Sequence, residues 1–147
     1  MKKISLLGST GSIGVNTLDV VERNPESFQV LAMSAGSNVD LFAEQVRKFK
    51  PKVASLFDTK KIATLKERVA DLDVEIIPGE EGSIAVATLS EADVVVSGVV
   101  GSAGLVPAME ALRAGKNLAL ANKETLVIAG ELVLKEAEKT NSQIIPI

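Results

Sequence analysis

The 147-residue chain contains neither cysteine nor histidine. Without cysteine, disulfides and thiol chemistry are excluded. Without histidine, the chain lacks the commonest general base and metal ligand. Any acid–base chemistry must therefore come from lysine, aspartate or glutamate.

Long apolar runs are also missing. Residues 1–3 (MKK) lead into a short apolar segment, and no later run approaches the length of a membrane span. The formal net charge is −3, and lysine and arginine are scattered rather than clustered. We therefore expect a cytoplasmic protein with no membrane and no nucleic-acid partner.

Short apolar runs alternate with longer segments of helical period, which is typical of repeated strand–helix–strand units. The candidate strands are residues 4–7, 29–33, 53–57, 74–77, 94–99, 118–121 and 143–147. Most are predominantly apolar, as in a parallel sheet that is buried on both faces. We predict an α/β fold with a doubly wound, mostly parallel sheet of the Rossmann-like, dinucleotide-binding type.

Helix boundaries are marked by capping residues and prolines. One helix is predicted over residues 12–23, and another begins after Asn38 and ends before Pro51. A later helix has Pro107 near its start and Gly115 as its C-terminal cap. The phenylalanines and methionines are interpreted as core residues.

A glycine-rich turn, residues 8–14 (GSTGSIG), lies between the first strand and the first helix. Gly8 and Gly11 can adopt positive φ and let the backbone approach a pyrophosphate, while the N–H groups from Ser12 onward point at the anion. The hydroxyls of Ser9, Thr10 and Ser12 add donors. Because the spacing is G-x-x-G-x-x-G, the prediction of a nucleotide phosphate site depends on the strand before and the helix after.

The end of the second strand carries no acidic residue to bond a ribose 2′-hydroxyl. Ser34, Ser37, Asn38 and another helix N-terminus are present instead, and this pattern favours NADP over NAD. No arginine or lysine stands in this segment.

Two later strand ends are candidate ligand sites. Residues 99–104 (VVGSAG) are small or apolar and would let the backbone pass close to a flat ring or a diphosphate, or would simply form a tight turn. Residues 122–124 (NKE) stand at the mouth of the sheet. Asn122 and Glu124 suit a helix start, whereas Lys123 opposes the helix dipole and indicates either an anionic ligand or a solvated lysine.

Seven spaced segments share a family pattern: residues 8–14 (GSTGSIG), 17–21 (TLDVV), 35–39 (AGSNV), 101–104 (GSAG), 113–116 (RAGK), 120–126 (LANKETL) and 144–147 (IIPI). In this order the chain resembles the 1-deoxy-D-xylulose 5-phosphate reductoisomerase family. The resemblance implies an oxidoreductase of non-mevalonate isoprenoid synthesis that rearranges its sugar phosphate substrate and reduces it with NADPH to 2-C-methyl-D-erythritol 4-phosphate. It also implies a divalent metal, Mg²⁺ or Mn²⁺, and a homodimer in the complete enzyme.

The resemblance implies three groups of residues that contact the cofactor. Those that bind its phosphates are Thr10, Gly11, Ser12 and Ile13, and those that bind its 2′-phosphate end are Gly36, Ser37 and Asn38. Asn122 and Glu124 make additional cofactor contacts. Lys123 matches a substrate contact, which gives this lysine an anionic partner. Ser37 stands where some family members have a lysine.

In the family, an Asp-Ser-Glu metal motif follows the segment that matches residues 144–147. We therefore expect residues 1–147 to form an NADPH-binding domain, with the catalytic and C-terminal domains, the catalytic residues and the metal ligands absent from this chain. We expect the chain alone to be inactive. Two alternatives are another NADP-dependent dehydrogenase, such as a semialdehyde dehydrogenase whose usual cysteine is missing here, and a nucleotide-binding module without chemistry.

Overall fold

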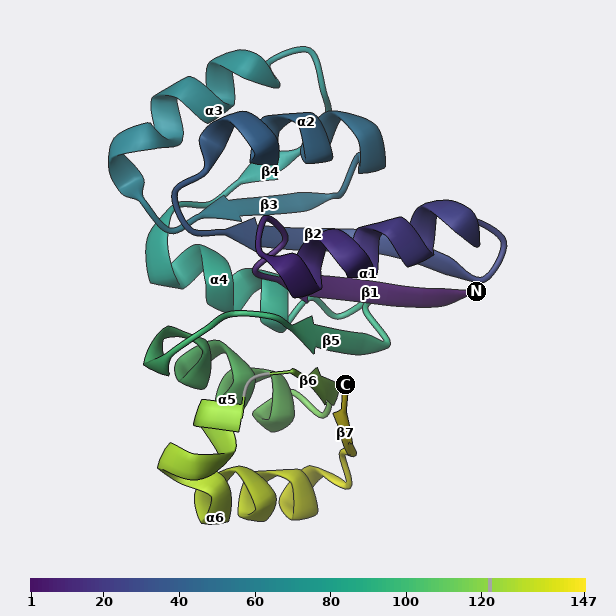
Figure 1. Ribbon diagram of the computed structural model, residues 1–147, viewed down its shortest axis with the longest axis vertical. Coiled ribbons are helices and arrows are strands. Elements are labelled where there is room, and N and C mark those ends of the chain that lie inside the picture. Colours follow the sequence, from purple (N-terminus) through teal and green to yellow (C-terminus); the bar gives the residue numbers. More distant parts are fainter. Residues whose placement is uncertain (122) are drawn as a thin grey trace.

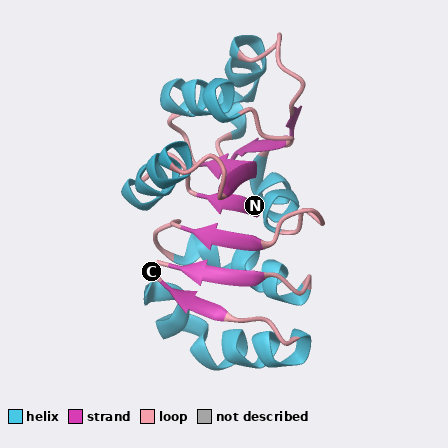
Figure 2. Ribbon diagram, turned by 90° about the vertical axis from the view of Figure 1, so that its right-hand side faces the viewer, coloured by secondary structure: helices cyan, strands magenta, loops and turns pink. Residues whose placement is uncertain are grey.

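The chain folds as a seven-stranded sheet with helices on both faces (Figure 1, Figure 2). The computed structural model describes residues 1–121 and 123–147, with the side chains of residues 123–126 and 128 outside the description. The strands are β1 (Lys2–Leu7), β2 (Phe28–Ala35), β3 (Val53–Leu56), β4 (Glu75–Ile76), β5 (Val94–Ser97), β6 (Asn117–Leu120) and β7 (Ile144–Pro146). Each overlaps a predicted strand, and every neighbouring pair runs parallel. The predicted fold class is confirmed.

The helices divide between the two faces of the sheet. They are α1 (Ser12–Arg23), α2 (Val39–Phe49), α3 (Ile62–Arg68), α4 (Gly79–Ala87), α5 (Leu105–Arg113) and α6 (Lys123–Thr140), with short 3₁₀ turns η1 (Thr59–Lys61) and η2 (Ser102–Gly104). Phe42 and Leu65 belong to a core on the α1–α3 side, and Leu112 and Val133 to a core on the α4–α6 side. Burial on both sides explains why the strands are mostly apolar.

In the part of the chain that the structure describes, no helix combines the length and the apolar character that a membrane span needs.

The predicted helix ends of α2 and α5 are confirmed. The Asn38 side chain caps α2 by accepting a hydrogen bond from the N–H of Leu41 at 3.3 Å. Lys50 takes a left-handed conformation with φ +49° directly before Pro51, which ends this helix. Gly115, with φ +78°, follows α5. Local sequence signals were sufficient here because each cap acts within a few residues.

The order of the strands reverses once, between β1 and β5. The sheet order is β4-β3-β2-β1-β5-β6-β7, so the chain first builds outward on one side of β1 and then on the other. The connections on either side of this switch point leave diverging loops at the carboxyl ends of the strands. Such a crevice is where open α/β sheets bind ligands.

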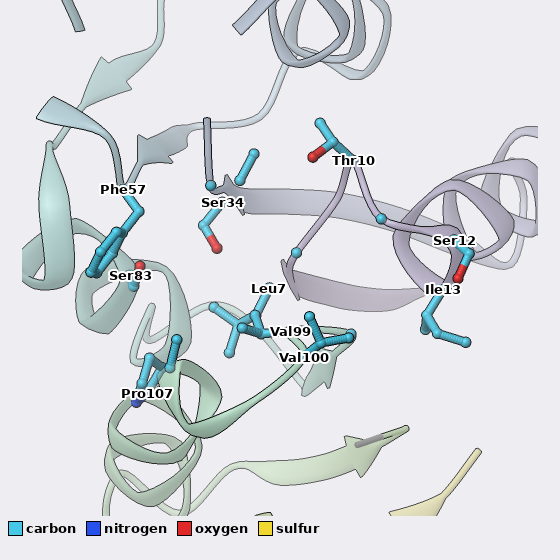
Figure 3. A pocket seen from close by; sticks show the side chains of 16 residues that line it. Leu7, Thr10, Ser12, Ile13, Ser34, Phe57, Ser83, Val99, Val100 and Pro107 are labelled. Carbon is cyan, nitrogen blue, oxygen red and sulfur yellow. The ribbon is translucent and has the colours of Figure 1, made fainter. Parts of the chain in front are cut away.

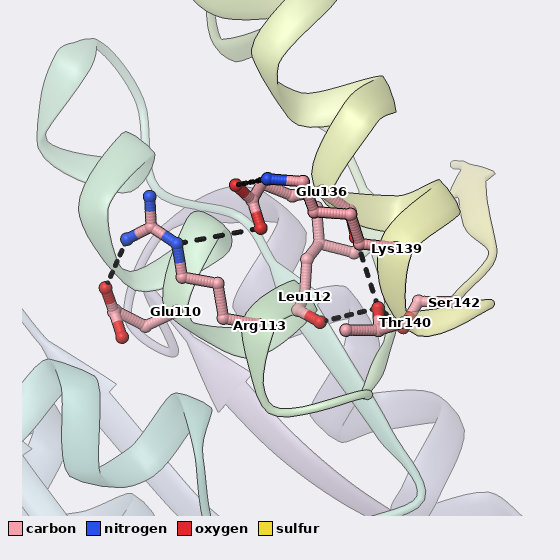
Figure 4. A network of polar contacts seen from close by, with 7 residues as sticks. All are labelled: Glu110, Leu112, Arg113, Glu136, Lys139, Thr140 and Ser142. Atoms are coloured by element: carbon pink, nitrogen blue, oxygen red, sulfur yellow. Dashed lines mark hydrogen bonds and ion pairs between the residues drawn. The ribbon is translucent and has the colours of Figure 1, made fainter.

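A polar network holds α6 against α5 in the C-terminal half (Figure 4). The Thr140 hydroxyl donates to the Leu112 carbonyl at 2.8 Å, near the end of α5. Arg113 pairs with Glu110 at 2.7 Å and reaches Glu136 of α6 at 3.7 Å. These contacts hold the part of α6 that follows its kink at Ala129 against α5.

A buried polar link ties the glycine-rich turn to α2. The Ser9 hydroxyl donates to Gln45 Oε1 at 2.7 Å, and Gln45 Nε2 donates to the Ser9 carbonyl at 2.9 Å. Ser9 is fully buried and Gln45 is 7% exposed. Because each polar group meets another inside the protein, the pair fixes the turn without the cost of an unpaired buried dipole.

We expect Gln45→Leu to lower the free energy of unfolding by about 1–3 kcal/mol, since it leaves the Ser9 hydroxyl and carbonyl buried without partners. Urea denaturation followed by circular dichroism measures this loss. Gln29→Leu is the matched control, because Gln29 is exposed on β2 and its replacement should change stability by less than about 0.5 kcal/mol. Equal stabilities of the Gln45 variant and the unaltered protein would contradict the proposed link.

Candidate nucleotide-binding site

A cavity of about 300 Å³ lies at the carboxyl ends of the strands, at the switch point between β1 and β5 (Figure 3). Its volume lies at the lower end of the range for small-molecule sites. Its walls are Leu7, Gly8, Thr10, Gly11, Ser12, Ile13, Ser34, Ala35, Gly36, Phe57, Ser83, Gly98, Val99, Val100, Ala103 and Pro107. The glycine-rich turn and the ends of β2 and β5 therefore meet at one site, as their order in the sequence predicted.

Two of the three glycines in the turn are required by the backbone. Gly8 has φ +79°, and its N–H and that of Ser9 both donate to the Ser34 carbonyl, at 3.0 and 2.8 Å. A Cβ atom at Gly14 would lie 2.2 Å from the Gly8 carbonyl oxygen. Only glycine at position 14 lets α1 start this close to the end of β1.

The prediction that Gly11 takes a positive φ is wrong. Gly11 has φ −77° and ψ 174°, an extended conformation that any residue can adopt. A Cβ atom there would lie 3.7 Å from the Gly8 carbonyl oxygen, which is ordinary contact. Because Gly11 lines the cavity, the missing side chain opens space for a ligand rather than relieving the backbone.

The three hydroxyls of the turn have different roles. Ser9 was predicted to donate to a phosphate, but it is fully buried and bonded to Gln45, so this prediction is wrong. Thr10 and Ser12 line the cavity, and Figure 3 shows them on the turn and at the start of α1. Unlike Ser9, these two residues stand in the cavity wall, where a ligand could reach them.

The start of α1 is open for an anion. Gly11 is its N-cap and supplies no side-chain hydrogen bond, and the first turn carries no acidic residue. Unpaired N–H groups and the positive end of the helix dipole therefore face the region of the cavity. This arrangement suits a phosphate group.

The segment after β2 was predicted to hold the 2′-phosphate end of NADP. Gly36 lines the cavity, and Ser37 and Asn38 follow it as exposed residues before α2. The Asn38 side chain caps α2. A lysine distant in sequence also reaches this segment, since Lys61 Nζ donates to the Ser37 carbonyl at 2.9 Å.

The sequence analysis did not assign Phe57 and Ser83 to the cavity wall, or Lys61 to the neighbouring Ser37 carbonyl. Phe57 is 52% exposed and lines the cavity, so the prediction that every phenylalanine is a core residue is wrong. Met1, 68% exposed, likewise departs from the predicted core. Phe57 directly follows the mostly apolar run from Val53 to Leu56, and no residue type at position 57 indicates that the chain leaves the sheet there.

The small residues after β5 form another wall of the cavity. Val99, Val100 and Ala103 line it, and Gly101 takes φ +76° before η2. A Cβ atom at Gly98 would lie 3.0 Å from Ile13 Cβ, which shows how tightly this loop passes the start of α1. The loop is thus a tight turn that also forms part of the cavity wall.

The described cavity wall contains no ionisable side chain. The shifted pKa values lie elsewhere: a side-chain hydrogen bond from Arg47 lowers the pKa of Asp71 to about 2, and one from Lys52 lowers the pKa of Glu91. Within residues 1–121 and the described side chains beyond them, no group of three acidic residues could hold a metal ion. The described wall of the cavity thus offers hydroxyl, backbone and apolar groups to a ligand.

The remaining predicted site residues follow β6. Asn122 lies outside the described residues, and so do the side chains of Lys123 and Glu124. The backbone of residues 123 and 124 begins α6.

The comparisons with known proteins all identify the same family. The family model for 1-deoxy-D-xylulose 5-phosphate reductoisomerase matches residues 4–130. Curated reductoisomerases from Desulfitobacterium hafniense and, in chloroplastic form, Mentha piperita are 49% and 53% identical over 147 residues. These matches cover 100% and 99% of this chain but only 39% and 31% of the relatives.

A solved structure agrees with the sequence matches. A DOX-P reductoisomerase in complex with NADPH, fosmidomycin and magnesium superposes with a TM-score of 0.95 at 38% identity, covering 99% of this chain and 36% of that one. Family model, relatives and structure agree over nearly all of the chain. The chain belongs to the 1-deoxy-D-xylulose 5-phosphate reductoisomerase family.

Proposed function

We propose that residues 1–147 form the NADPH-binding domain of a 1-deoxy-D-xylulose 5-phosphate reductoisomerase. The observation that carries this proposal is the cavity at the β1–β5 switch point, with the glycine-rich turn and the open start of α1 in its wall. Backbone N–H groups and two hydroxyls suit a pyrophosphate, and the apolar remainder suits flat rings. The NADPH held by the superposed reductoisomerase supports the same choice.

The proposed cofactor contacts form two groups around this cavity. Thr10, Gly11, Ser12 and Ile13 bind the phosphates, and Gly36, Ser37 and Asn38 bind the 2′-phosphate end. The first four and Gly36 line the cavity, which supports these roles. Asn122 and Glu124 add cofactor contacts and Lys123 binds the sugar phosphate, in line with the family resemblance.

The complete enzyme would rearrange 1-deoxy-D-xylulose 5-phosphate and reduce it to 2-C-methyl-D-erythritol 4-phosphate. The metal, Mg²⁺ or Mn²⁺, would activate the substrate oxygens. Magnesium in the superposed reductoisomerase supports this part. We further propose a homodimer in the cytoplasm, although the Mentha piperita relative is chloroplastic.

We expect the chain to bind NADPH at least about tenfold more tightly than NADH. The 2′-phosphate adds negative charge, and residues 36–38 present no carboxylate to oppose it. Isothermal titration calorimetry with both cofactors measures the ratio. Equal affinities, or a preference for NADH, would contradict this assignment.

Gly11→Val is expected to abolish NADPH binding while the fold persists. Position 11 has an extended backbone and room for a Cβ atom, so the added side chain projects into the cavity rather than into the protein. Circular dichroism reports the fold and calorimetry reports the binding. Gly11→Ala is the graded control, with a smaller loss of affinity because its single methyl fills less of the cavity. Unchanged binding in the valine variant would place the phosphate site elsewhere.

In a complete enzyme, we expect Lys123→Ala to impair use of the sugar phosphate more than NADPH affinity, because the ammonium would meet the substrate's anionic oxygens. Steady-state NADPH oxidation separates the two Michaelis constants. Residues 1–147 alone, given NADPH, metal ion and substrate, should show no turnover. A variant defective only in NADPH binding would reassign Lys123 to the cofactor, and turnover by the short chain would overturn the domain assignment.

A further inference from the structure

The pairing of β2 with β3 continues beyond both strands and joins two loops. The Phe57 N–H donates to the Ala35 carbonyl and the Asp58 N–H donates to the Gly36 carbonyl, each at 2.9 Å. The segment after β3 is thereby fixed to the segment that was assigned to the 2′-phosphate. Its backbone is therefore held beside the cavity, with Phe57 in the wall.

The turn η1 then brings a cation to the same place. Asp58 Oδ1 accepts from the Lys60 N–H at 3.1 Å, and the Lys61 N–H donates to the Asp58 carbonyl at 3.1 Å. From this turn, Lys61 Nζ reaches the Ser37 carbonyl at 2.9 Å. An ammonium has three donors, so two remain for another acceptor.

Carboxylates near this segment are already engaged. Asp40, in the first turn of α2, pairs with Arg68. One oxygen of Asp58 accepts the backbone bond in η1. Lys61 is exposed, and its recorded partner in the described structure is a neutral carbonyl.

Phe57 supplies an exposed aromatic surface on the same segment, four residues before this lysine. It is 52% exposed, whereas the ring of Phe42 is fully buried. Figure 3 shows the Phe57 ring on the cavity wall near Ser34 and Ser83. A purine stacks readily on such a surface.

We propose that Lys61 and Phe57 form the adenosine end of the cofactor site, in which Lys61 binds the 2′-phosphate and Phe57 stacks on the adenine. This inference rests on the proposed NADPH-binding function and assigns two specificity residues to it. Lys61 supplies the cation that is missing from residues 34–38. The same carbonyl contact that holds Lys61 places its charge beside Ser37.

The two residues have different expected effects on affinity. Lys61→Met should weaken NADPH binding about tenfold and leave NADH within about twofold, because only NADPH carries the 2′-phosphate. Lys61→Gln keeps a donor for the Ser37 carbonyl but lacks the charge, and should show the same selective loss. Phe57→Ala should weaken both cofactors by about the same factor, roughly tenfold, because both carry adenine.

The test is calorimetric titration of the 147-residue chain with NADPH and NADH, with circular dichroism to verify folding. Lys66→Met is the matched control, since it removes the same charge from α3 at a residue that lines a separate hollow with Val69 and Leu72. The ratio of the NADPH and NADH affinities of this variant should equal that of the unaltered protein. Lys61→Arg keeps the positive charge, so this variant should retain most of the preference for NADPH over NADH.

Three outcomes would be adverse. If the unaltered chain binds neither dinucleotide, the proposed function fails and this inference with it. If the unaltered chain binds NADPH, and Lys61→Met and Lys61→Gln leave the ratio of the NADPH and NADH affinities unchanged, then only the proposal that Lys61 binds the 2′-phosphate is overturned. If Phe57→Ala binds both cofactors normally, the stacking role is overturned.

Discussion

The close approach of α1 to the end of β1 is the contact on which the rest of the site depends. Gly14 packs directly over Gly8, where an added Cβ atom would lie 2.2 Å from a carbonyl oxygen. This packing brings the open start of α1 to the switch point of the sheet. The Ser9–Gln45 link holds the turn from the side of α2, and the loop after Gly98 closes against Ile13. The site thus follows from tight backbone packing rather than from charged side chains.

Local signals predicted most of the fold. Strands appeared as apolar runs, and Asn38, Pro51 and Gly115 marked helix ends because their effects act within a few residues. Contacts between distant residues could not be predicted in this way. Gln45 lies 36 residues from Ser9, and Lys61 lies 24 residues from Ser37. Both depend on which strands are neighbours and in what register, and neither residue stands out by its sequence context.

The sequence correctly predicted where the cavity lies, but the roles predicted for some of its residues were wrong. The glycine-rich turn does line the cavity, yet Gly11 has an ordinary extended backbone and Ser9 is a buried structural group. A glycine triplet in sequence cannot show which glycine serves the backbone, which serves packing and which leaves room for a ligand. Those roles depend on what surrounds each Cα atom, and this is determined by β2, β5 and α2.

The different roles of Gly11 and Gly14 have a consequence for how variants of this protein would behave in a cell. Damage at Gly14 disturbs packing between α1 and β1, so the chain would be exposed to proteases and its abundance would fall. Damage at Gly11 leaves the interior intact, so a defective chain would pass cellular quality control and accumulate at normal levels. Abundance measurements would therefore detect only the first kind of lesion. The second kind would be found only by measuring ligand binding by the intact protein.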